Sequence, residues 1–119
     1  MRTLVIDDDA LTLTAVSEKL KAEGHVVFTA GSGSKALNVL NNENIELIIC
    51  DVLMPGVSAL SLLSILNNKK MGKIPLILMS SLNSAETISK SLGLEISAFF
   101  PKPIDYKRLF SLVKNMGTA

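Results

Sequence analysis

The chain has 119 residues with 12 basic and 11 acidic side chains, a formal net charge of +1 at pH 7. A chain of this length forms one domain with one core, so we expect a single domain over residues 1–119, either a protein in itself or one excised from a longer chain. Because the charges are nearly balanced and form no long block of one sign, we expect no direct binding to nucleic acid or to a membrane. Cys50 is the only cysteine, which excludes an internal disulfide and a cysteine-rich zinc site and indicates a cytoplasmic protein.

Five short apolar runs predict strands, and they alternate with segments of helical period. The strands are predicted at residues 3–6, 25–30, 45–50, 74–79 and 97–100. The helices are predicted at residues 11–23, 32–42, 60–66 and 83–92, with a fifth helix after Asp105. Gly24 marks the end of the first helix, and Ser32 and Asp105 are typical N-cap residues.

The alternation of strands and helices, without a hairpin signal, indicates parallel strands joined by right-handed crossovers. Helices then cover both faces of the sheet, which is a doubly wound α/β architecture. The runs at residues 45–50 and 74–79 are the most apolar, so we expect them at the centre of the sheet. In such a sheet, ligands bind beyond the carboxyl ends of the strands.

Acids, a hydroxyl and an amine follow four of the predicted strands. They are Asp7 and Asp8 after the first, Asp51 after the third, Ser80 after the fourth and Lys102 after the fifth. Clustered carboxylates stay ionised together when they share a cation, and hard oxygen ligands suit Mg²⁺. A carboxylate beside Mg²⁺, a lysine and a hydroxyl can attack phosphorus, because the cations neutralise the phosphoryl oxygens. The pattern therefore predicts a Mg²⁺ site at which an aspartyl phosphate forms.

Four segments, each at a strand end, carry a family resemblance: LVIDDD, LIICDVLMPG, LILMSS and FFPKP. Over essentially its whole length the chain resembles the receiver domain of two-component response regulators. The resemblance implies a flavodoxin-like, five-stranded sheet of order 2-1-3-4-5, in which the fifth strand is an edge that tolerates Pro101. It also implies that Asp51 takes a phosphoryl group from a sensor histidine kinase or a histidine phosphotransfer protein. The domain is then a signalling switch and not a turnover enzyme.

The resemblance also implies how Mg²⁺ is held. The ligands are Asp7, Asp8, Asp51 and the backbone carbonyl of Leu53, with Asp8 bound directly and Asp7 partly through water. The carbonyl role explains why the side chain at position 53 need not be polar.

The remaining site residues take their roles from the same resemblance. Ser80 and Lys102 assist phosphoryl transfer, and Ser80 and Phe99 form the switch that responds to it. The Lys102–Pro103 bond matches the position of a cis peptide in the family. The sequence does not identify the downstream partner or output domain. It also leaves open whether phosphorylation produces a homodimer.

Two other functions stay open. The segment VIDDDAL partly resembles the motif of haloacid-dehalogenase-type phosphohydrolases, with Asp7 as nucleophile and Asp9 as acid/base, although only Asp105 supplies an acid after Lys102. The chain could also be a receiver-like binding module that is not phosphorylated. Within the receiver interpretation, Asp9 is simply a residue that begins a helix, and Cys50 is a small buried strand residue.

Overall fold

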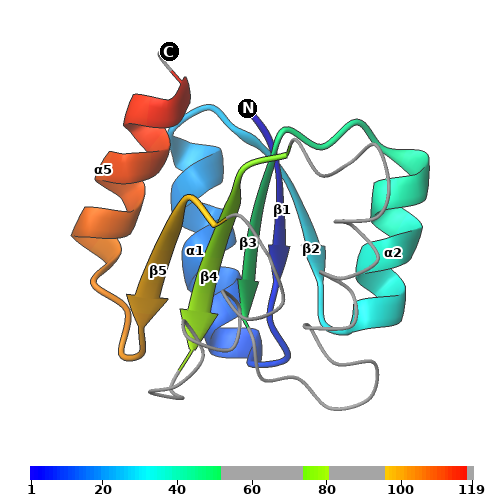
Figure 1. The fold of residues 1–119 in the computed structure, drawn as a ribbon, viewed down its shortest axis with the longest axis horizontal. Coiled ribbons are helices and arrows are strands. Elements are labelled where there is room, and N and C mark those ends of the chain that lie inside the picture. Colours follow the sequence, from blue (N-terminus) through cyan, green and yellow to red (C-terminus); the bar gives the residue numbers. More distant parts are fainter. Residues whose placement is uncertain (52–73, 81–95, 118–119) are drawn as a thin grey trace.

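Five parallel strands form a single sheet in the order β2-β1-β3-β4-β5 (Figure 1). The computed structural model describes residues 1–51, 74–80 and 96–117. The strands are β1 (Arg2–Ile6), β2 (Val26–Ala30), β3 (Leu47–Asp51), β4 (Leu76–Ser80) and β5 (Ala98–Pro101). The predicted parallel sheet and its strand order are confirmed.

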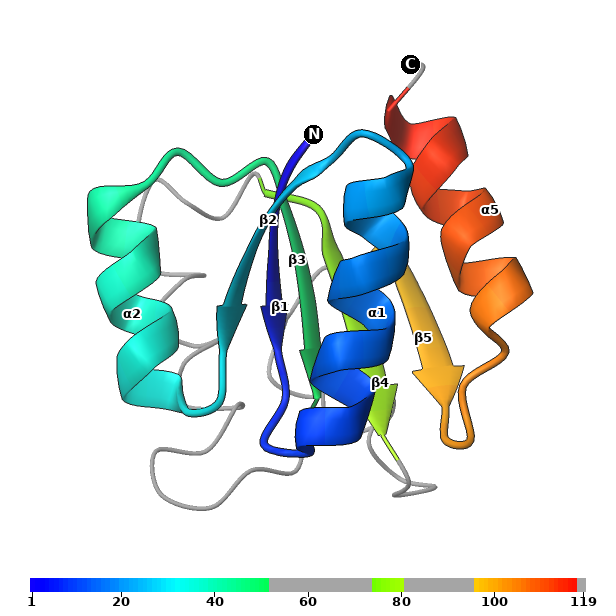
Figure 2. The ribbon, with the colours of Figure 1, turned by 180° about the vertical axis from the view of Figure 1, so that it is seen from behind.

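Three helices lie in the described part of the chain and cover both faces of the sheet. They are α1 (Ala10–Ala22), α2 (Gly33–Asn42) and α5 (Tyr106–Gly117). Helices α1 and α5 lie together on one face and α2 lies on the other, which Figures 1 and 2 show from opposite sides. The doubly wound architecture is thereby confirmed. None of these three helices has the length and apolar character needed to cross a bilayer, and the helices predicted at residues 60–66 and 83–92 lie outside the described residues.

The ends of these helices carry the residues that the sequence predicts. Gly24 follows α1 with a φ of 93°, a left-handed conformation that favours glycine. The hydroxyl of Ser32 accepts a hydrogen bond of 3.3 Å from the Lys35 amide at the start of α2. The carboxylate of Asp105 accepts one of 3.2 Å from the Arg108 amide at the start of α5. Local sequence therefore sets where these helices begin and end.

The core has two parts, because alternate residues of each strand face opposite helical layers. On one face, Leu4 and Ile6 of β1 share a buried cluster with Ala36 and Leu40 of α2. On the other face, Val5 shares a second cluster with buried residues of α1 and α5, namely Val16, Leu20, Leu109, Phe110 and Val113. The two clusters hold β1 between the helical layers and so fix the position of the residues that follow it.

The two most apolar strands lie in the interior of the sheet, as predicted. Strands β3 and β4 are buried along their whole length, whereas β2 and β5 at the edges are partly exposed. Pro101, which has no N–H for a strand ladder, ends the edge strand β5. The third strand is shifted from its predicted bounds, because it begins at Leu47 and includes Asp51, which pairs with Met79. The backbone of Asp51 is therefore held by the sheet.

Replacing Leu20 by Ala should destabilise the protein by about 2–5 kcal/mol, because this fully buried side chain would leave a cavity between α1 and the sheet. The matched control is Leu11→Ala on the same helix, where the side chain is 82% exposed and the change should stay within about 0.5 kcal/mol. Urea unfolding of both variants measures the difference. Equal losses of stability would contradict this packing of α1.

Candidate functional site

The parallel register brings the ends of four strands to the same edge of the sheet. Ile6 of β1 lies opposite Cys50 of β3. Ser80 of β4 lies opposite Pro101 of β5. The residues that end or directly follow these strands therefore share this edge, namely Asp7, Asp51, Ser80 and Lys102. The predicted convergence of four distant segments is confirmed.

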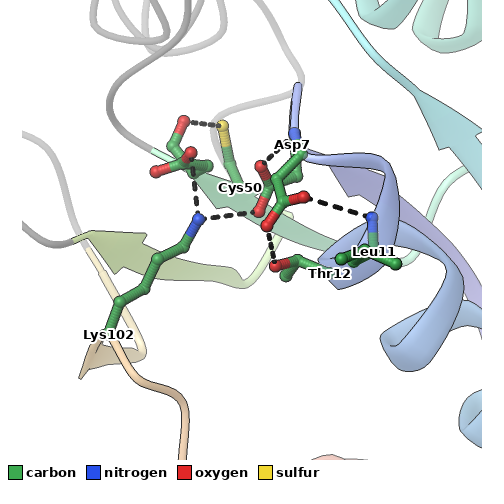
Figure 3. A network of polar contacts seen from close by, with 7 residues as sticks. Asp7, Leu11, Thr12, Cys50 and Lys102 are labelled. Atoms are coloured by element: carbon green, nitrogen blue, oxygen red, sulfur yellow. Dashed lines mark hydrogen bonds and ion pairs between the residues drawn. The ribbon is translucent and has the colours of Figure 1, made fainter.

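The ammonium group of Lys102 joins the two buried carboxylates of this edge (Figure 3). Its Nζ lies 3.1 Å from Oδ2 of Asp7 and 3.3 Å from Oδ2 of Asp51. The Asp7 side chain is fully buried, that of Asp51 is 6% exposed and that of Lys102 is 22% exposed. Carboxylates at this depth need an opposite charge, because burial without one disfavours their ionised form. Lys102 supplies that charge.

The same contacts determine the charge state of Lys102. Burial acts to lower the pKa of its ammonium group, but the hydrogen bond to Asp7 and the negative charges of Asp51 and Asp7 outweigh this effect and raise the pKa. Lys102 is therefore protonated at neutral pH. An ammonium in this position can neutralise oxygens of a group that is transferred to either carboxylate.

Three carboxylates of this edge form a cluster that could hold a metal ion. Asp7, Asp8 and Asp51 each offer one oxygen, and these atoms lie within 4.8 Å of one another. Asp8 is exposed, whereas the other two are buried, so the cluster opens towards solvent on one side. Three hard, anionic oxygen ligands with room for water match the preference of Mg²⁺. The donor set therefore fits the ion that the sequence predicts.

Ser80 and Phe99, the predicted switch residues, lie on neighbouring strands. Ser80 is 1% exposed at the end of β4, and its carbonyl accepts a hydrogen bond of 2.9 Å from the Lys102 amide. Phe99 lies opposite Leu78 and is partly buried against the apolar cluster that contains Leu78. Because side chains alternate along a strand, Ser80 shares a face of β4 with Leu78 and so lies on the same face as Phe99. The two predicted switch residues thus lie on the same face of neighbouring strands.

Two further predictions concern the backbone near the site. The peptide bond between Lys102 and Pro103 is cis, as expected. Leu53, predicted to offer its carbonyl to the metal, lies outside the described residues.

Asp9 contacts a residue of the site, which the sequence did not predict. It is the N-cap of α1, as predicted, and its carboxylate accepts hydrogen bonds from the Leu11 amide and the Thr12 hydroxyl. In addition, its backbone amide donates a hydrogen bond of 2.9 Å to Oδ1 of Asp7. The residue-type signal for this contact is Asp7 itself, because an aspartate carboxylate commonly accepts the backbone amide two residues further along the chain.

Cys50 is the buried strand residue that the sequence predicts. Its Sγ lies 3.3 Å from the carbonyl oxygen of Asp51 and donates to it. Burial, followed by the negative charges of Asp51 and Asp7, raises the pKa of the Cys50 thiol. The neutral thiol is unreactive in this environment, so Cys50 takes part in packing and not in nucleophilic chemistry.

A family model described as the response regulator receiver domain matches residues 3–114. The chain belongs to this family. The resemblance carried by the four sequence segments is confirmed, and the charged edge described above is that of a receiver domain, which is a signalling domain of two-component systems.

Individual relatives of this receiver domain agree with the assignment. The response regulator receiver protein from Pseudomonas putida has a TM-score of 0.88 and 27% identity over 96% of this chain and 95% of its own. TrrA from Thermotoga maritima, solved in complex with Mg²⁺–BeF, has a TM-score of 0.81 and 28% identity over 96% of each chain. The transcriptional regulatory protein CpxR homolog of Haemophilus influenzae is 32% identical over 95% of this chain, which spans 48% of that protein. The chain thus covers about half the length of that curated relative.

Replacing Lys102 by Met should lower the stability of the receiver domain at neutral pH, because Asp7 and Asp51 lose their shared cation. The raised pKa of Lys102 contributes stability that is complete below the ordinary lysine value of about 10.4 and is lost as pH rises through the higher value of the folded state. The difference in melting temperature between wild type and variant should therefore be constant up to about pH 10 and shrink above it.

The control for this measurement is Lys35→Met, which removes a lysine from the exposed surface of α2. Both variants are compared with the wild type in metal-free buffer. A Lys102→Met difference that stays constant through the alkaline range would contradict a stabilising role of the ammonium group.

Proposed function

We propose that this receiver domain is a Mg²⁺-dependent phosphoacceptor switch that is phosphorylated on Asp51. The donor is a phosphohistidine of a sensor histidine kinase or of a histidine phosphotransfer protein. The observation that carries the proposal is the position of the Lys102 ammonium, 3.3 Å from Oδ2 of Asp51, beside a cluster of three acids. This combination places a buried nucleophile next to the positive charge that phosphoryl transfer requires.

The transfer itself needs few protein groups. A carboxylate oxygen of Asp51 forms a bond to phosphorus while the phosphorus–nitrogen bond of the donor breaks, and the electron pair of that bond stays on the imidazole nitrogen. The Lys102 ammonium neutralises charge on the phosphoryl oxygens as they approach. The Ser80 hydroxyl donates a hydrogen bond to one of these oxygens. Because Asp51 belongs to β3, the sheet holds the nucleophile in place for an in-line approach.

The metal is proposed to bind at the acid cluster. Asp7, Asp8 and Asp51 would hold it, together with the backbone carbonyl of Leu53. When bound, Mg²⁺ supplies positive charge that stabilises the transferred phosphoryl group. Carboxylate oxygens are hard ligands of the kind that Mg²⁺ prefers.

The wider role follows from the family and is part of the proposal. The domain acts in the cytoplasm as a signalling module, and it catalyses its own phosphorylation and dephosphorylation without turnover of another substrate. Its output is read by a downstream protein or output domain, and phosphorylation controls a homodimer if the output requires one. A single domain over residues 1–119 suffices for the phosphoacceptor step, because the described edge already contains nucleophile, cation and acid cluster.

Incubation with acetyl phosphate and Mg²⁺ should add the mass of one phosphoryl group to the wild type and none to Asp51→Asn, as measured by intact-protein mass spectrometry. Removing Mg²⁺ with EDTA should abolish the addition, because the phosphoryl charge is then poorly neutralised. Asp105→Asn changes an exposed acid at the start of α5 and serves as the control, which should be modified like the wild type.

Other results would support the other functions. A wild type that gains no mass would indicate a binding module that is not phosphorylated. Hydrolysis of p-nitrophenyl phosphate that is lost in Asp7→Asn and retained in Asp51→Asn would indicate a phosphohydrolase.

The switch is expected to connect Ser80 with Phe99. A phosphoryl group on Asp51 draws the Ser80 hydroxyl towards it, and Phe99, which is partly buried on the same face of the sheet, turns into the space that is released. Addition of beryllofluoride with Mg²⁺ should shift the amide NMR signals of residues 83–107 in the wild type. Ser80→Ala should bind beryllofluoride with much smaller shifts at Phe99. Unchanged signals in the wild type would rule out this switch.

A further inference from the structure

The two oxygens of the Asp7 carboxylate have different partners. Oδ2 faces the Lys102 ammonium at 3.1 Å. Oδ1 accepts the backbone amide of Asp9 at 2.9 Å. Because the side chain is fully buried and contacted from both sides, its orientation depends on both donors. The Lys102 contact belongs to the reaction chemistry, whereas the Asp9 amide has no chemical part in it.

The position of the Asp9 amide depends in turn on the start of α1. Asp9 has the extended backbone of an N-cap, with φ −82° and ψ 108°. Its Oδ1 accepts the Leu11 amide at 3.2 Å, and its Oδ2 accepts the Thr12 hydroxyl at 2.8 Å. These bonds tie Asp9 to a helix that is anchored in the core by Val16 and Leu20. Figure 3 shows Leu11 and Thr12 on the helix side of Asp7, and Lys102 on the other side.

Both oxygens of the Asp9 carboxylate are thus engaged by α1. The acid cluster of the described residues consists of Asp7, Asp8 and Asp51, and Asp9 is not a member of it. Asp9 is therefore placed to act on the site through its backbone.

We propose that Asp9, held by Thr12, is a positioning residue that orients the Asp7 carboxylate for Mg²⁺ without binding the metal. The capping bonds fix the peptide before Asp9, its amide holds Oδ1 of Asp7, and Oδ2 is left facing the centre of the site. Groups that hold a ligand in its binding orientation contribute to metal affinity although they do not touch the ion. The proposal rests on the proposed Mg²⁺ site.

Substitutions at Asp9 separate this role from a simple charge effect. Asp9→Asn removes the charge but keeps a good N-cap, whereas Asp9→Ala removes both. Thr12→Val keeps the shape of the side chain and removes the hydroxyl, whereas Thr12→Ser keeps the hydroxyl. If Asp9 acts through position, Asp9→Asn and Thr12→Ser should bind Mg²⁺ like the wild type. If Asp9 acts through its charge, Asp9→Asn should bind Mg²⁺ as weakly as Asp9→Ala.

The experiment measures Mg²⁺ affinity by isothermal titration calorimetry in the full chain without any phosphodonor. Asp9→Ala should bind Mg²⁺ about tenfold more weakly, the lower end of the effect known for groups that hold metal ligands. Thr12→Val should weaken binding severalfold, and Asp9→Asn and Thr12→Ser should stay within about twofold of the wild type, well inside that range.

Two further measurements exclude a general loss of structure. Ser32→Ala removes the N-cap of α2 and should lower the melting temperature about as much as Asp9→Ala, but it should leave Mg²⁺ affinity unchanged. Hydrogen exchange in the metal-free protein should show that the Asp9 amide loses protection in Asp9→Ala and Thr12→Val and keeps it in Ser32→Ala.

The outcomes are distinct from those for the proposed function. If the wild type binds Mg²⁺ and Asp9→Ala binds it equally well, the positioning role is wrong and the phosphoacceptor function stands. If Asp9→Asn is as weak as Asp9→Ala, charge and not position is responsible, and the proposal is also overturned. If the wild type binds no Mg²⁺, the metal site of the proposed function fails, and this inference fails with it.

Discussion

A single ammonium group between two buried carboxylates is the contact on which the functional edge of this receiver domain depends. Lys102 follows β5, Asp7 follows β1 and Asp51 ends β3, so the contacts of 3.1 and 3.3 Å join three separate segments of the chain. Two carboxylates at this depth are unfavourable together without a cation. The edge is therefore sensitive to any change of charge at Asp51, which is the property that a phosphorylation switch requires.

The sheet makes this contact possible by holding each charged residue at the end of a buried strand. Strand β3 is covered on both faces, and its last residue is Asp51 itself. Strand β1 is held between two apolar clusters, so the direction in which Asp7 leaves the sheet is determined by packing. The start of α1 adds a hydrogen bond to Asp7 from the amide of Asp9. Supports of this kind keep reactive groups in place although their mutual repulsion would separate them.

Much of this arrangement could be predicted, because its main signals are local. Apolar runs of strand length and apolar residues at helical spacing indicated the elements, and Gly24, Ser32 and Asp105 indicated helix ends that the structure bears out. Asp51 was predicted to follow its strand, whereas it belongs to β3, because pairing with Met79 extends the strand to a charged residue. The pairing depends on the neighbouring strand, which local sequence does not describe.

The amino-acid sequence by itself determined the class of fold, the order of the elements and the four segments that carry the charged and hydroxyl residues. These follow from periodicity, turn chemistry and residue type, which act over a few positions of the chain. Only the tertiary structure decided which oxygen of Asp7 meets Lys102 and which meets the Asp9 amide. That choice depends on side-chain orientation and on contacts between residues as far as 95 positions apart, and packing of the whole sheet sets both.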